Sequence, residues 1–248
     1  MVVSPHTCRR RLLGCALFGL ILLGSDSRRA WADPHDASVL DASQCQPGTR
    51  ARLEWLVSRL ESRELYADLW WRGWIGFYGL GVVVQSARAG VENDGGERAD
   101  LIVSAVKAVG GVTRLYFSRP VARLGADPVL EQPVTDEARC VRAVEQLEGL
   151  LRQAAEESTR RWSWTPHLVN VAVNTAGALI VTQGFGEDSG WESAAVGIAV
   201  GEAMLWSHPW TGHDDLKEYD SRFEAAALPG PTWALAPYGR GLQMQVRF

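Results

Sequence analysis

The residues best suited to chemistry lie near the carboxyl end. His208 and His213 stand close to Asp214 and Asp215 in the chain, and imidazole with carboxylate is a common ligand set for catalytic zinc. The sequence therefore allows a metal-dependent hydrolase that uses His208, His213 and Asp214. A solvated loop after Pro209 explains these residues more simply, so we favour a non-catalytic protein and predict no catalytic residue, metal or cofactor.

The acidic, glycine-rich stretch GFGEDSG at residues 184–190 is a second candidate site. Its spacing is G-x-G-x-x-x-G, and Glu187 and Asp188 occupy the place where a phosphate would lie, so phosphate binding is disfavoured. The sequence contains no G-x-S-x-G, H-E-x-x-H or C-x-x-C. The usual markers of serine hydrolases, zincins and thioredoxins are thus missing.

Residues 1–32 have the form of an export signal. Arg9, Arg10 and Arg11 precede an apolar run from Leu12 to Leu23, and Ala30-Trp31-Ala32 offers a cleavage site. Arg28 and Arg29 in the cleavage region leave an uncleaved signal anchor as the alternative. We expect a protein of the periplasm or one associated with the outer membrane.

The mature chain is acidic. Removing residues 1–32 takes away five of 25 basic and one of 29 acidic residues, which leaves 20 and 28 and a formal charge of −8. This charge argues against nucleic acid as a partner, because phosphate contacts require a positive surface. It also argues against simple electrostatic attachment to anionic lipids.

Two cysteines, Cys45 and Cys140, remain in the mature chain. In an oxidising compartment they predict one disulfide, with two unrelated buried thiols as the alternative. Such a bridge would close a long loop and contribute about 3 to 5 kcal/mol on the chain-entropy account.

The elements that would position these residues are mostly helical. We expect a disordered lead-in at 33–48, a first helical unit at 49–120, a linker at 121–134 and a second helical unit at 135–210. Each unit joins an amphipathic helix to an apolar hairpin, at Trp70–Pro120 and Trp162–Trp210. Because Asn93 and Asp188 are separated by 95 residues, as are the two cysteines, the units look like related copies. Accidental alternation of helices is the alternative.

The apolar segments allow three interpretations: the core of a soluble bundle, insertion in a membrane, or strands of an α/β fold. Their uncharged runs are shorter than the 20 or so residues of an ordinary span, and Lys107, Asn170, Asn174 and Glu202 interrupt them. Ser193, Gly197 and Gly201 recur at i, i+4 and i+8, a spacing that lets helix backbones approach. We predict a helix-packing face there. Tryptophans at the segment ends favour membrane association.

Residues 211–248 form a polar segment and a tail that alternates at period two, which predicts a short β-hairpin. The terminal row Leu242, Met244, Val246 and Phe248 resembles the last strand of bacterial outer-membrane barrels. No set of alternating strands precedes it, so we expect the hairpin to pack on the bundle or on a partner.

Together these patterns predict a mainly α, exported envelope protein that is a membrane-associated structural or assembly component. The alternative is a soluble periplasmic bundle that binds a lipid-like or other apolar ligand between its hairpins. We expect a membrane or apolar ligand, and a protein partner or a second copy, as partners.

Overall fold

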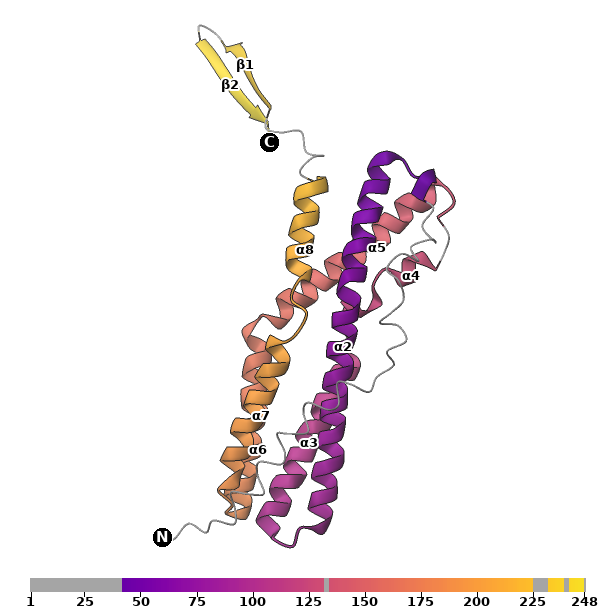
Figure 1. Cartoon of the computed structure of the whole chain (residues 1–248). Helices are drawn as coiled ribbons and strands as arrows, with labels where there is room; N and C mark the ends of the chain where they lie inside the picture. The colour runs from indigo at the N-terminus through magenta and orange to yellow at the C-terminus, as the bar shows by residue number, and fades with distance from the viewer. Residues whose placement is uncertain (1–41, 132–133, 225–231, 239–240, 248) are drawn as a thin grey trace.

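The chain is mainly helical, as the sequence predicts. The computed structural model describes residues 42–131 and 134–224, together with the backbone of 232–238 and 241–247 (Figure 1). The helices are α2 (Pro47–Val91), α3 (Gly95–Phe117), α4 (Asp127–Leu130), α5 (Glu137–Arg161), α6 (Trp164–Phe185), α7 (Ser189–Trp206) and α8 (Gly212–Tyr219). Short turns are η4 (Ala42–Gln44), η5 (Val121–Leu124) and the π-helical η6 (Asp220–Glu224).

Helix α2 is a single helix of 45 residues, about 68 Å long at 1.5 Å per residue. We expected its amphipathic first part and its apolar second part to be separate elements. They join because the residues between Tyr66 and Trp70 contain neither proline nor glycine, so nothing there breaks the helix. The two parts of this one helix thus belong to two differently packed regions of the molecule.

Two helical hairpins, α2–α3 and α6–α7, form one end of the molecule. The turn from α2 to α3 is capped by Asp94, whose side chain accepts hydrogen bonds from the amides of Gly96 and Glu97. The turn from α6 to α7 uses Gly186 at φ 70°, a left-handed position that favours glycine at a helix end. Within each hairpin the helices pack side by side (Figure 1).

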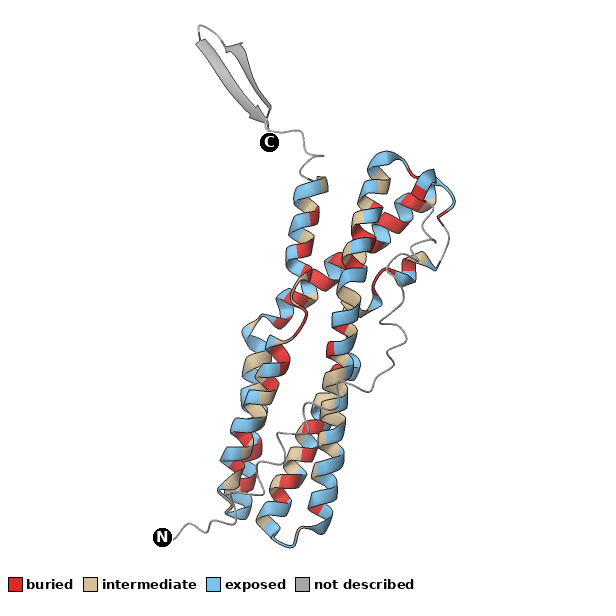
Figure 2. Cartoon of the chain, viewed as in Figure 1, coloured by how far each residue is buried: buried red, intermediate tan, exposed pale blue. Residues whose placement is uncertain are grey.

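The other end has a conventional buried core. Leucines of α2 and α5 meet beneath Tyr219 of α8, and all of them are buried (Figure 2); the largest are Leu53, Leu56, Leu147 and Leu151. We call residues 47–69 of α2 with α4, α5 and α8 the polar-surfaced half. Residues 70–91 of α2 with α3, α6 and α7 form the apolar-surfaced half.

Two expected boundaries change. Residues 42–48, expected to belong to the disordered lead-in, are structured: the η4 turn is tied to α2 by Arg50, which donates to the carbonyls of Ala42 and Ser43. The expected linker at 121–134 contains η5 and α4. The predicted export signal and most of the lead-in lie outside the described residues.

The tail backbone forms strands β1 (Thr232–Tyr238) and β2 (Gly241–Arg247), paired antiparallel with Thr232 opposite Arg247. The side chains of this segment and Phe248 lie outside the described residues, so the expected apolar row stays a prediction.

Candidate functional site

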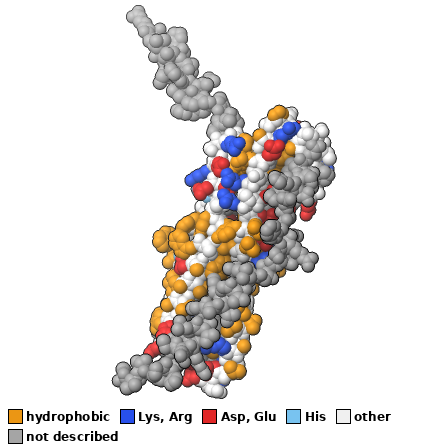
Figure 3. All heavy atoms as spheres, viewed as in Figure 1, with side chains coloured by type: hydrophobic (Ala, Val, Ile, Leu, Met, Phe, Trp, Pro, Cys, Tyr) orange, Lys and Arg blue, Asp and Glu red, His pale blue; other side chains and the backbone are white. Residues whose placement is uncertain are grey.

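The apolar-surfaced half carries its large hydrophobic side chains on the outside. Figure 3 shows hydrophobic side chains spread over the middle of this part, with charged side chains toward the other half and near the hairpin turns. Exposed large hydrophobic residues come from all four of its helices and include Val83, Val84, Ile102, Val106, Leu168, Ile180 and Val196. Contiguous apolar surface of this kind is uncommon on soluble monomers and marks contact with a membrane or a partner.

Helix α6 is the clearest case. Among the described residues it alone is long and apolar enough to cross a membrane by length and composition, with a mean hydropathy of 1.4. Only 22% of its most apolar stretch is buried inside the structure, whereas the core helix of a soluble protein would be mostly covered. Most of the apolar residues of α6 are therefore not covered by the described part of the chain.

Tryptophans gather where the two halves meet. Trp70 and Trp74 each donate their indole N–H to the hydroxyl of Ser207, at 3.0 and 3.1 Å. Trp162 lies 5.0 Å from Trp206 between ring centroids and is half exposed. Amphipathic indoles at one level of a bundle are typical of a membrane–water interface.

The interior of the apolar-surfaced half is mixed in polarity. Between the hairpins lies a groove of about 1240 Å³, and its polar lining includes Gln85, Asp100, Ser104, Lys107, Arg114, Asn170, Asn174 and Ser193. One oxygen of Asp100 and one of Gln85 are buried without a hydrogen-bond partner among the described residues. These polar groups are set among apolar side chains such as Phe77, Leu101 and Met204, and polar groups in such a setting are less common than exposed ones.

The predicted face on α7 points at α6 and α3. A methyl group on Gly197 or Gly201 would overlap the side-chain amide of Asn174 or Asn170 respectively. Ser193 lies one turn earlier, with its hydroxyl 3.1 Å from that of Ser104. The small residues thus allow α7 to approach two polar helix faces closely.

Hydrogen bonds satisfy three of the four polar residues that interrupt the apolar segments: Asn170, Asn174 and Glu202. Asn170 donates to the carbonyl of Ile198 at 3.0 Å and to Glu202 at 2.9 Å. Glu202 also lies 2.6 Å from the Nδ1 of His167, and Asn174 donates to the Asn170 carbonyl at 2.9 Å. This chain joins α6 to α7, so the polar residues hold the hairpin together.

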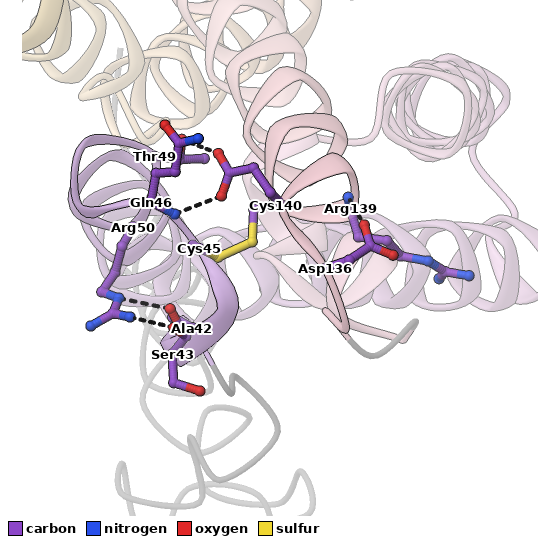
Figure 4. Close-up of a disulfide and its surroundings, with 10 residues drawn as sticks. Ala42, Ser43, Cys45, Gln46, Thr49, Arg50, Asp136, Arg139 and Cys140 are labelled. Atoms are coloured by element: carbon purple, nitrogen blue, oxygen red, sulfur yellow. Dashed lines mark hydrogen bonds between the residues drawn. A yellow bond between two sulfur atoms is a disulfide. The ribbon is translucent and has the colours of Figure 1, made fainter.

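In the polar-surfaced half, Cys45 and Cys140 form a disulfide between the start of α2 and the first turn of α5 (Figure 4). Glu137 reinforces the junction by accepting from the Gln46 amide at 2.6 Å and from the Thr49 hydroxyl at 2.8 Å. The bridge encloses a sequence separation of 95 residues that contains the whole α2–α3 hairpin.

The residues considered for metal binding are not brought together. His208 is buried, with its Nε2 3.7 Å from Glu157, while Asp215 contacts Arg59 and Arg63 of α2. His213 and Asp214 are exposed. Within residues 42–131 and 134–224 no group of three or more metal-ligating side chains occurs.

His208 instead belongs to a buried cluster at the junction of the halves. Burial lowers its pKa, helped by the charge of Arg161 and only partly offset by Glu157. Burial alone would raise the pKa of Glu157, but polar contacts with His208, the Val121 amide and Arg161 lower it overall. The cluster thus places the ion pair of Glu157 and Arg161 beside the imidazole of His208.

Sequence reasoning placed an apolar-ligand site between the hairpins as an alternative, but it missed the polar lining of the groove and this cluster. The only available signal for this lining was a lysine and two asparagines within apolar segments, and periodicity alone does not show that they face one another.

No family model matches the chain, and no curated protein and no solved structure is significantly similar to it.

Proposed function

We propose that the mature protein is an exported, non-catalytic envelope protein whose apolar-surfaced half inserts into a membrane as two helical hairpins. The polar-surfaced half then stays in water and acts as a structural or assembly module. The observation that carries this proposal is the change of outer surface, from charged to apolar, between the two halves of one continuous molecule. Helix α6, with 22 residues, is about 33 Å long, which matches the roughly 30 Å of a bilayer core.

Fractionation of cells that express the full chain tests insertion. We expect the protein to stay in the membrane pellet after osmotic shock and after an alkaline wash, and to be extracted by detergent. A soluble exported marker in the same cells is the control for release. Recovery of the protein in the osmotic-shock fluid would overturn the proposal.

We also propose that the two hairpins are related by duplication. Helices α3 and α7 begin at Gly95 and Ser189, nearly the same offset as the cysteines, and each follows an acidic turn. A bundle of two related hairpins offers similar faces to a second copy or to an envelope partner. We expect the C-terminal strands to contribute to that contact, and deletion of 242–248 with unchanged localisation and assembly would limit them to a local hairpin.

A second candidate function is favoured by the groove between the hairpins. Its volume of about 1240 Å³ exceeds the 300 to 1,000 Å³ or so of most small-molecule sites, so it has room for a lipid-like ligand. In this case the protein would be a soluble periplasmic carrier, and osmotic shock would release it together with the bound ligand. The same fractionation therefore separates the two candidates.

A further inference from the structure

The groove contains two cations on the inner face of α3. Lys107 and Arg114 both line it, and among the described residues neither has an ion-pair partner. Within the described part of the chain, Lys107 donates one hydrogen bond, a long one of 3.5 Å to the Ser193 hydroxyl. A cation taken partly out of water without a counterion is costly, so the pair calls for a negative charge from outside the described chain.

The carboxylates of the groove supply that charge only in part. They are Glu92, Glu97, Asp100 and Glu192, all near the hairpin turns. Asp100, two helical turns before Lys107 or about 10.5 Å along the axis, attracts the Lys107 ammonium without forming an ion pair with it. Among the described residues no carboxylate acts on Arg114 in this way, and the charge of Arg161 opposes it, so an anion between Lys107 and Arg114 would stabilise both cations.

The backbone between the two cations leaves room for such a group. Gly110 lines the groove, and a Cβ placed on it would meet nothing within 4 Å. At the next residue, Gly111, the ring of Tyr78 lies where a side chain would be, with its Cδ1 2.7 Å from the ideal Cβ position. The groove also has hydrocarbon in its lining, from Phe77, Leu101, Val200 and Met204.

We propose that the groove binds an anionic amphiphile, whose carboxylate or phosphate lies between Lys107 and Arg114 beside Gly110. Its hydrocarbon lies along the apolar lining contributed by α2 and α7. This inference deepens the second candidate function by naming the ligand class, and it rests on the same groove whether or not the apolar-surfaced half is inserted in a membrane.

Radiolabelled oleate is a suitable probe for the full mature chain held in an uncharged detergent. We expect saturable binding that oleyl alcohol, with the same chain and no charge, displaces at least tenfold less well than unlabelled oleate. Lys107→Gln and Arg114→Gln should each weaken oleate binding about tenfold, because a charge-assisted hydrogen bond is lost. Lys217→Gln and Arg142→Gln, on the polar-surfaced half, are the matched controls.

Gly110→Leu tests the site without removing charge. The leucine side chain would enter free space, so the fold should persist. It should occupy the headgroup position and reduce oleate binding at least tenfold. Gly149→Leu, also open within 4 Å but on α5, should bind like the wild type. Equal binding by wild type, Lys107→Gln and Gly110→Leu would overturn the proposal, as would equal displacement by oleyl alcohol.

Inorganic phosphate separates a lipid headgroup from a free anion. Displacement of oleate by millimolar phosphate would assign the site to a soluble anion and overturn the amphiphile. The outcomes are independent of insertion: a membrane-bound protein that fails to bind oleate refutes only this inference. A protein released by osmotic shock that binds oleate refutes only the insertion proposal.

Discussion

The two halves of the molecule differ in how they bury the apolar side chains of the same helix, α2. In residues 47–69 of α2 the leucines Leu53, Leu56 and Leu60 are buried and charges face water. In residues 70–91 of the same helix Val83 is 65% exposed, while Gln85 turns its oxygen into the interior without a partner in the described chain. The comparison shows that the large apolar side chains of α2 change from buried to exposed along the helix. The change occurs near Trp70, where the tryptophans gather.

The halves also differ in what holds them together. The polar-surfaced half has a disulfide, a leucine core and Tyr219, which donates to Glu148 and accepts from Arg52. The apolar-surfaced half has close backbone approach at Gly197 and Gly201 and hydrogen bonds through Asn170 and Asn174. Small residues and interhelical polar contacts are how helices associate where hydrophobic burial gives no driving force.

Removal of the disulfide should have the largest effect. Cys45→Ser frees a loop with a separation of 95 residues, and on the chain-entropy account the loss is about 3 to 5 kcal/mol. Thermal unfolding in detergent, followed by circular dichroism with and without reductant, measures it. We expect reductant to lower the wild-type midpoint and to leave the variant unchanged. A wild type that is insensitive to complete reduction would contradict this.

A charge on each surface compares the two environments directly. Val83→Arg places a cation on the outer face of the apolar-surfaced half, and Val141→Arg does so on α5, where the valine is 42% exposed. If lipid surrounds Val83, the first change costs about 2.5 to 3.5 kcal/mol, and membrane-bound protein should fall while the second variant behaves like the wild type. Equal membrane yields for both would break the comparison.

Two glycines of the polar-surfaced half, Gly212 and Gly149, should respond in opposite ways to substitution by alanine. A Cβ on Gly212 would lie 2.6 Å from the backbone carbonyl oxygen of Ala154, so Gly212→Ala forces α8 away from α5 and costs about 1 to 3 kcal/mol. Gly149 has nothing within 4 Å, and Gly149→Ala should stabilise α5 by up to about 1 kcal/mol. Midpoints of thermal unfolding that move in the same direction would contradict this contrast.

The junction should give the smallest and most pH-dependent effect. Because the pKa of His208 is lowered from 6.5 by burial, the folded state holds the neutral ring, and stability is lost as pH falls below about 6.5 toward the lowered value. The lowered pKa of Glu157 adds a further loss below 4.5. The slope for one group is at most about 1.4 kcal/mol per pH unit.

His208→Phe keeps an aromatic ring against Trp70, whose centroid lies 4.8 Å from that of His208. We expect this variant to lose the pH dependence of the unfolding midpoint between pH 7 and 5 and to keep the acid loss below pH 4.5. Identical pH profiles in the two proteins would show that His208 does not titrate with unfolding.

The sequence by itself determined the helical class, because apolar residues recur at helical spacing, and it singled out Cys45, Cys140, Gly197 and Gly201 by their spacing. It did not determine that α2 runs unbroken, since the absence of a breaker is a weaker signal than the change in composition beside it. Only the tertiary structure decided that Lys107, Asn170 and Asn174 face a shared interior while the valines face out. The physical reason is that periodicity defines the two faces of a helix, whereas the neighbouring helices decide which face is covered.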